Sequence, residues 1–321
     1  DIPLDLNPYQ VNMDLALEIK DLSPLYFKGY YSRYIKLEKL DGLIDFRGNF
    51  KGRLTEEVES KGDLRLNDIE LIYPDAYYRP VRITSGRLKF NAKIDQNDVE
   101  LKSFNLVVDN LSVKGAIALN NFRDKNKMEI HGKASSEVIP VDYAKMLIPT
   151  KAFLKLESGH YISAFIEDLV DGNLKNAKFK VDGLIKNFKN KQYINPEMID
   201  GRAEAENVRL RINEHTSPAV LTSGEWILKH RFMYWNSFSG YYGKSVFTHL
   251  ASKFINIGTD TTYTMEVKGL VDTNDAIDIL TWKTFRPLPF LEEFTGKGFV
   301  KTDITFSIFS YRKEDEKFRL L

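Results

Sequence analysis

The 321-residue sequence contains no cysteine. Without a thiol the chain cannot form disulfides, use a cysteine nucleophile, or bind zinc or an iron–sulfur cluster through cysteine. An excess of one charge is also missing, because 46 basic and 45 acidic side chains leave a net charge of +1. Nucleic-acid binding requires a clearly basic surface, so we do not expect nucleic acid as a partner.

Long hydrophobic runs are absent as well. No stretch reaches the roughly 18 consecutive apolar residues that a transmembrane helix needs, and no signal peptide is recognisable at the start. The chain begins at Asp1. We therefore expect it to be a processed or excised piece of a longer protein, with a targeting or anchoring segment left out.

Catalytic and metal-binding signatures are equally scarce. The five histidines do not show the His-x-x-x-His spacing that places two imidazoles on one helical face; they are His131, His160, His215, His230 and His249. No nucleophile elbow, Walker loop or dinucleotide fingerprint occurs. The sequence predicts a protein that is not an enzyme and that uses neither a metal nor a cofactor.

Apolar and polar residues alternate with a period of two along much of the chain. Successive side chains of a strand point to opposite faces, so this pattern predicts antiparallel strands with one apolar and one polar face. The clearest runs are 88–94, 104–108, 111–119, 208–212 and 300–308. Turn residues between the runs predict hairpins at Asp95–Asp98, Asn120–Asn121 and Asp171–Asn173.

Short amphipathic helices are predicted at 140–147 and 274–282, the second with Asn or Asp as its N-cap. A third opens at Ser23, with Pro24 in its first turn. All three helices are short and few compared with the strands. We expect them to leave apolar strand surface uncovered.

The sequence also contains an internal repeat. The segment that starts at Gly62 aligns with the one at Gly201 (201 − 62 = 139), and that at Met128 aligns with that at Met265 (265 − 128 = 137). We expect one continuous sheet of repeat copies and not independent domains. Its predicted parts are a partial repeat with a helical connector at 1–41, a first copy at 42–158, a second copy at 159–295, and the start of a further copy at 296–321.

The predicted fold is mainly β: a long, curved antiparallel sheet, or β-groove, built from repeated strand units with short junction helices. If the apolar face forms an open groove, its lining is predicted to be Leu88, Phe90, Phe104, Leu106, Val108, Leu111 and Val113. The same residues would serve equally well as the closed core of an ordinary β-sandwich.

Aromatic residues crowd one segment of the second copy: Trp226, Phe232, Tyr234, Trp235, Phe238, Tyr241 and Tyr242. Such a cluster favours core packing or a cross-strand ladder. Its alternatives are an aromatic rim at a lipid headgroup and a stacking surface for sugar.

The glycine-marked strand rhythm from Gly86 to Leu119 resembles the AsmA-like family, the AsmA/TamB/YhdP group of periplasmic β-groove proteins. The step from Met265–Val271 into 276–280 is similar to the strand-to-helix junctions of that family. The resemblance implies anchoring in the inner membrane and phospholipid transport between the inner and outer membranes.

Together these observations predict non-enzymatic binding and shielding of lipid acyl chains in a hydrophobic β-groove. The resemblance implies a role in outer-membrane homeostasis and biogenesis within the cell envelope. The expected partners are phospholipid or other lipid acyl chains and, in addition, inner- or outer-membrane proteins. The expected location is the periplasm, with a tether to the inner membrane in a segment absent from this chain. The alternative is a structural or adhesive β-repeat module that binds protein or glycan.

Overall fold

The computed structural model describes residues 12–32, 36–53, 56–124, 126–148, 150–153, 166–188, 198–229, 232–255, 262–282, 289–309 and 319–320. The chain forms two compact units. Unit 1 consists of Asp1–Ser136 and Phe179–Lys189, and unit 2 consists of Glu137–Lys178 and Asn190–Leu321. The predicted limits of the repeat copies stay a prediction, and Gly159, where the second copy was expected to begin, lies outside the described residues.

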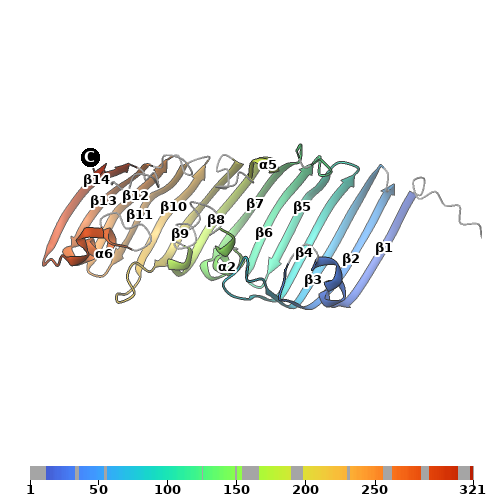
Figure 1. Ribbon diagram of the computed structural model, residues 1–321, viewed down its shortest axis with the longest axis horizontal. Helices are drawn as coiled ribbons and strands as arrows, with labels where there is room; N and C mark the ends of the chain where they lie inside the picture. Colours follow the sequence, from blue (N-terminus) through green and yellow to red (C-terminus); the bar gives the residue numbers. More distant parts are fainter. Residues whose placement is uncertain are drawn as a thin grey trace, which may run out of the picture. The chain divides into compact units, whose positions relative to one another are not determined.

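In unit 1 the strands lie side by side in sequence order, each antiparallel to the next (Figure 1). The strands are β1 (Asn12–Leu22), β2 (Lys39–Arg53), β3 (Glu57–Ile72), β4 (Val81–Asp95), β5 (Val99–Val108), β6 (Leu111–Asn120) and β7 (Glu129–Pro140). The helical segments are η1 (Pro24–Phe27), α1 (Lys28–Tyr31) and α5 (Ile185–Phe188).

In unit 2 the strands again follow sequence order and pair antiparallel. They are β8 (Leu169–Leu184), β9 (Ile199–Leu210), β10 (Ala219–Lys229), β11 (Phe232–Tyr242), β12 (Ser245–Ile255), β13 (Thr262–Asp272), β14 (Phe299–Phe309) and β15 (Arg319–Leu320). The helices are α2 (Val141–Leu147), α3 (Thr150–Phe153), α6 (Thr273–Leu280) and η3 (Pro289–Glu293). The end of β7, residues 137–140, belongs to this unit, and the end of β8, residues 179–184, belongs to unit 1.

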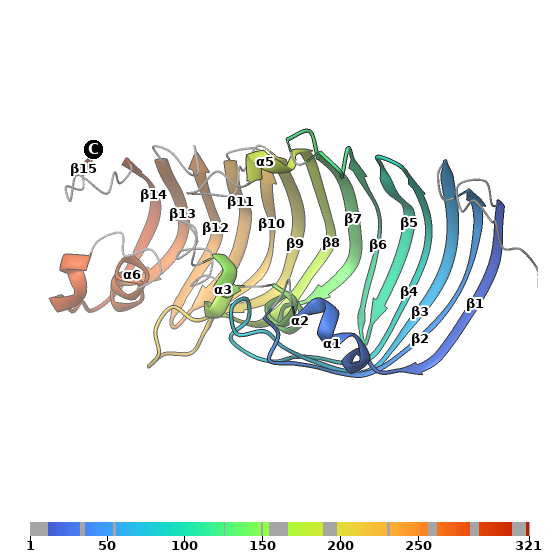
Figure 2. The same ribbon diagram turned by 45° about the vertical axis from the view of Figure 1, so that its right-hand side comes forward.

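The predicted fold class is confirmed: the chain is mainly β, and each unit is an antiparallel sheet whose strands bend along their length (Figure 2). The predicted helices are confirmed too. Ser23 caps η1 by accepting a hydrogen bond from the Leu25 amide, with Pro24 at the first position. Helix α6 is capped by Asp272, which accepts from the Asn274 amide, so its cap precedes the segment 274–282 in which the Asn or Asp cap was predicted. These caps fix where each strand gives way to a helix.

The repeat is visible in the element order and in its irregularities. Strands β3 to β7 lead into α2, and β9 to β13 lead into α6. Asp68 and Asn207 share a left-handed backbone at φ +50° and +51°, and they are 207 − 68 = 139 residues apart. A glycine at φ +118° lies opposite each of them, Gly42 in β2 and Gly172 in β8. Both copies therefore carry the same bulge, with a glycine where the partner backbone comes too close for a Cβ atom.

This bulge corrects one prediction. The residues Asp171–Asn173 were expected to form a turn, but they lie inside β8. Gly172 has a positive φ of +118°, as turn glycines often do. A Cβ atom there would come within 2.5 Å of the Val208 Cα atom, so this strand position requires glycine. Another predicted hairpin, at Asp95–Asp98, is present between β4 and β5, where the Asp95 amide donates to the Asp98 carbonyl.

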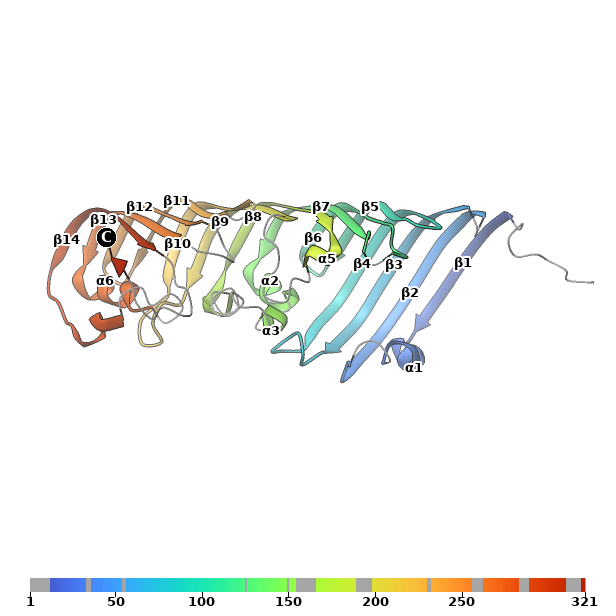
Figure 3. The same ribbon diagram turned by 45° about the horizontal axis from the view of Figure 1, so that its top comes forward.

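The largest buried cluster lies in unit 2. Helices α2 and α6 contribute Val141, Ala276 and Ile279, which pack with strand residues such as Phe238 and Val271. Val141 and Tyr242 are fully buried. Figure 3 shows α6 close to β13, which it contacts. The expectation that the helices leave the strands uncovered is therefore wrong for this part of unit 2.

Candidate functional site: the apolar face of unit 1

Strand register brings the seven predicted groove residues onto one face of unit 1. Leu88 pairs with Leu106, and Phe90 pairs with Phe104. Leu106 in turn pairs with Val113, and Val108 pairs with Leu111. Neighbouring strands add Phe46, Leu64, Ile94, Ile117 and Ile130 to the same face. We call this surface the apolar face of unit 1; that it contacts lipid stays a prediction.

Burial divides the seven residues into two groups. Val108 and Leu111 are only 3% and 4% exposed, whereas the other five are half-buried. The buried pair lies at the strand ends where Pro24 of η1 and Ala76 of the loop between β3 and β4 are buried as well. Away from that end, Leu15 and Ile94 are 45% and 44% exposed on the same face. The closed-core interpretation thus fits one end of the strands, and an accessible apolar surface fits the rest.

A row of glycines and phenylalanines crosses the middle of this face. The paired positions run Gly48, Gly62, Phe90, Phe104 and Gly115 from β2 to β6. A Cβ atom on Gly62 would lie 2.4 Å from the Phe90 ring, and one on Gly115 would lie 2.7 Å from the Phe104 ring. The rings therefore lie down over the glycines, as aromatic side chains do when they cover a glycine in a sheet.

This row was missed by the sequence reasoning as a structural unit. Its signal is present in the sequence, because each glycine occupies an apolar position of the two-residue alternation. What was missing is the register that places each ring beside a glycine. The physical result is a low, continuous apolar surface, with Phe46 and Phe90 stacked at 6.5 Å between ring centroids.

The opposite face of unit 1 is polar and rich in ion pairs. Lys93 and Glu57 lie 2.7 Å apart, and Lys102 and Glu59 lie 2.9 Å apart. Arg87 donates from two nitrogens to the Asp63 carboxylate, and this hydrogen bonding lowers the pKa of Asp63 below its usual range. The hydrogen bond from Lys102 likewise lowers the pKa of Glu59. A face with so many charged groups is stable in contact with water. The apolar face, in contrast, exposes nonpolar surface that a binding partner would cover.

The aromatic cluster of unit 2 divides between the two faces of its sheet. Trp235, Phe238 and Tyr242 belong to the buried cluster. The Tyr242 hydroxyl donates to Asp278 at 2.8 Å, and burial raises the Tyr242 pKa far above its usual range. Core packing, the favoured interpretation, applies to these residues and to the partly buried Trp226.

The remaining aromatic residues lie on the other side of β11. Phe232 and Tyr234 stack with centroids 6.0 Å apart, and the Lys253 ammonium lies 5.3 Å from the Tyr234 ring. Tyr241 is 49% exposed. Only this smaller group is available for stacking against a ligand.

The described histidines take part in local polar contacts. His131 Nδ1 lies 2.9 Å from the Asp182 carboxylate, and His249 lies 3.8 Å from Glu266. His160 and His230 lie outside the described residues. Within the described ranges, no three His, Asp or Glu side chains gather as a metal site would require, and no helix has the length and apolar character to cross a bilayer.

Comparison with protein-family models, with curated proteins and with solved structures finds no significant match.

Proposed function

We propose that this protein binds and shields lipid acyl chains on the apolar face of unit 1, without catalysis. One observation carries the proposal: five of the seven residues of β4, β5 and β6 are only half-buried, on a face that is apolar from strand to strand. Soluble proteins rarely leave a large contiguous apolar patch without a partner. A lipid tail is a partner that needs no matching polar groups.

The dimensions and energies support a lipid tail as the ligand. One leaflet of acyl chains is about 15 Å thick, half of the roughly 30 Å hydrocarbon layer. Strands are spaced about 4.8 Å apart, so a tail laid across the face would cover about three strands. Each methylene removed from water contributes about 0.8 kcal/mol. A tail that slides along such a surface exchanges each contact for a similar one, which favours movement over fixed binding.

The biological setting is part of the same proposal. The strand rhythm resembles that of the AsmA-like family. This resemblance implies a periplasmic protein that helps to transport phospholipid between the inner and outer membranes. In that setting the partners would be phospholipid and membrane proteins of the envelope. The tether to the inner membrane would lie in a segment outside this chain.

Two neighbouring positions on β5 provide a matched test. Leu106 belongs to the apolar face, and Val107 points to the polar face and is 39% exposed. Leu106→Asp and Val107→Asp place the same charge on the same strand. Each protein is purified without harsh detergent and its bound lipid is measured by mass spectrometry, with circular dichroism as the folding control.

We expect stoichiometric phospholipid on the parent protein and on Val107→Asp, and strongly reduced lipid on folded Leu106→Asp. An aspartate on the apolar face would have to lose its water against the lipid tail, which is costly for an unpaired charge. A parent protein without lipid, or equal lipid on both folded variants, would reject the proposal.

One observation favours a second candidate, a structural or adhesive module that binds glycan or protein. The stacked Phe232 and Tyr234 with Lys253 beside them form an aromatic and cationic surface on unit 2. Aromatic faces of this kind stack on sugar rings. Phe232→Ala would then abolish binding to an immobilised glycan array while leaving bound lipid unchanged.

A further inference from the structure

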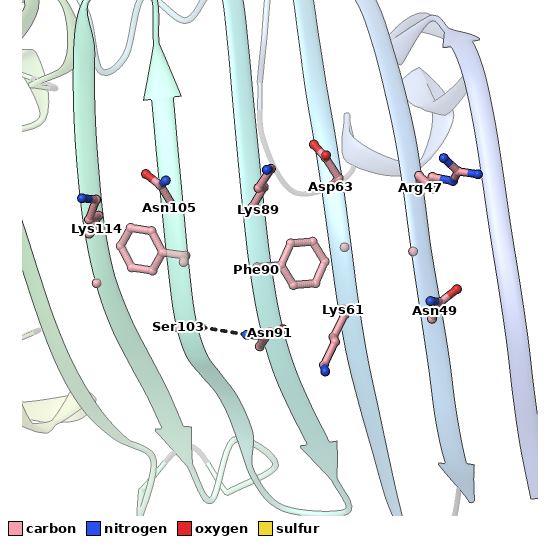
Figure 4. Close-up of a pocket in the computed structure, with 14 residues that line it drawn as sticks. Arg47, Asn49, Lys61, Asp63, Lys89, Phe90, Asn91, Ser103, Asn105 and Lys114 are labelled. Carbon is pink, nitrogen blue, oxygen red and sulfur yellow. Dashed lines mark hydrogen bonds between the residues drawn. The ribbon is translucent and has the colours of Figure 1, made fainter.

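A hollow of about 710 Å³ lies on the polar face of unit 1 (Figure 4). Its walls come from two neighbouring cross-strand rows, and its floor is the backbone of the glycine–phenylalanine row between them. One row contains Arg47, Asp63, Lys89, Asn105 and Lys114, paired in that order, and the other contains Asn49, Lys61, Asn91 and Ser103. The hollow has the size of an ordinary small-molecule site.

The charge in this hollow is unbalanced. Four basic residues line it from four strands, Arg47, Lys61, Lys89 and Lys114, against a single carboxylate. That carboxylate, Asp63, is already held by Arg87. Within the part of the chain that the structure describes, none of the four cations has a carboxylate oxygen within 4.0 Å. On the same face Lys93 and Lys102 are each ion-paired with a glutamate, so these four cations differ from that pair.

The spacing lets three of the cations reach one anion. Lys61 is the diagonal neighbour of both Arg47 and Lys89 across β3 and its adjacent strands. Diagonal neighbours in a sheet lie about 7–8 Å apart, a distance that long basic side chains can close around a shared ligand. Lys114 is two strands beyond Lys89, roughly 10 Å away, and could meet a second anionic group.

The uncharged lining adds both donors and an acceptor. Asn91 donates to the Ser103 hydroxyl at 3.0 Å and keeps a second N–H for a ligand. The Asn105 Oδ1 atom is buried and has no hydrogen-bond partner among the described residues. With almost no accessible surface, this oxygen can meet a ligand hydroxyl only if the Asn105 side chain turns toward the hollow, whereas the second Asn91 N–H can donate to such a hydroxyl directly. The cations hold the anionic part of the same ligand.

We propose that this hollow binds a phosphate ester that also carries hydroxyl groups. Phosphate has three oxygens that accept charge-assisted hydrogen bonds from lysine and arginine, which suits the cluster better than a lone carboxylate. A soluble sugar phosphate and the headgroup of a phospholipid share this chemistry. The site lies on the face opposite the proposed acyl-chain surface and does not depend on it.

The test compares two double variants that remove the same charge from the same face. Lys61→Gln/Lys89→Gln changes the unpaired cations of the hollow, and Lys93→Gln/Lys102→Gln changes two ion-paired lysines. The probes are glucose 1,6-bisphosphate, measured by calorimetry with glucose as control, and vesicles of phosphatidylglycerol or phosphatidylcholine, measured by co-sedimentation. Circular dichroism checks the fold of each variant.

We expect Lys61→Gln/Lys89→Gln to weaken binding by roughly tenfold or more, because charge-assisted contacts to phosphate are the strong ones, and the control to change it less than about twofold. Saturable binding of the bisphosphate identifies a soluble ligand, and binding of phosphatidylglycerol vesicles alone identifies a headgroup; either supports the site. Binding of neither probe, or equal weakening by both double variants, overturns it. Leu106→Asp should leave probe binding intact, so failure here is separable from failure of the acyl-chain proposal.

Discussion

The apolar faces of the two units begin from the same strand pattern and end with different burial. In unit 2 the face is closed: Phe238 is 3% exposed and Tyr242 is fully buried beneath side chains from α2 and α6. In unit 1 the corresponding surface leaves Phe90 and Phe104 half-buried. The alternation of apolar and polar residues therefore produces an apolar face. Whether that face is buried in a core depends on whether helices pack against it.

Polar contacts explain why α6 stays on unit 2. The Asp275 carboxylate accepts hydrogen bonds from the amides of Lys244 and Ser245 and from the Ser245 hydroxyl, at 2.7–2.9 Å. Asp278 accepts from Tyr242. Both carboxylates come from α6, so the helix is joined to the turn between β11 and β12 as well as to the apolar cluster. Burial in unit 2 is thus fixed by directional bonds in addition to packing.

The largest expected difference between the units concerns the loss of one phenyl ring. Phe238→Ala should lower the free energy of unfolding by about 3–5 kcal/mol, because it empties a buried site. Phe90→Ala should cost roughly 1–2 kcal/mol, since a half-exposed ring has less transfer free energy to lose. Urea denaturation of both variants measures the two values. Equal losses would mean that the face of unit 1 is as closed as that of unit 2.

A smaller effect is expected from releasing α6. Asp275→Ala leaves the Lys244 and Ser245 amides without their acceptor, which should cost about 2–3 kcal/mol. Hydrogen exchange should show α6 losing protection first. Asp303→Ala is the control, because Asp303 is 73% exposed and its ion-pair partner among the described residues is Lys268; it should stay within about 0.5 kcal/mol of the parent. Unchanged exchange in α6 would show that packing alone holds the helix.

The smallest effect concerns the polar faces, where the two units should behave alike. Hydrogen bonding to arginine lowers the pKa of Asp63 in unit 1 and of Asp171 in unit 2. Asp63→Asn and Asp171→Asn should each cost less than about 1 kcal/mol at pH 7, because solvent screens both pairs.

The sign of the pH dependence follows from the lowered pKa. Each carboxylate contributes its stability above the unfolded pKa of about 3.9 and loses it as the pH falls through the lower folded value. The difference between parent and variant in urea midpoint should therefore be fully present at pH 7 and shrink steadily as the pH falls below the unfolded pKa of about 3.9. If the difference in urea midpoint between parent and variant grew on acidification in only one unit, the polar faces of the two units would not behave alike.

The period-two pattern was sufficient to predict the strands and the two-faced sheet, and cap residues with amphipathic spacing predicted the helices, including the cap at Ser23. The cap of α6 is Asp272, two residues before the predicted start of that helix. It could not place bulges, because Gly172 carries the same local signal in a strand as in a turn. The close approach of Val208, nearly forty residues later, is what requires the glycine. Nor could the pattern show that α2 and α6 cover strands, since that depends on contacts such as Tyr242 with Asp278.

The candidate sites show the same limit. The seven apolar residues were predictable as a set, because they fall on adjacent strands with matching alternation. The basic hollow was not, because Arg47, Lys61, Lys89 and Lys114 come from four strands and meet only when the register is known. Each of them looks like an ordinary solvated residue when read along the chain.

Pairing between consecutive strands has a consequence for how such a chain is made. Within each unit a strand needs only the strand before it and the strand after it, so hydrogen bonding can advance hairpin by hairpin as the polypeptide emerges. Among the described residues, each strand pairs with the strands next to it in the sequence order. Duplication or loss of a whole copy would change the reach of the sheet without requiring any other copy to be redesigned.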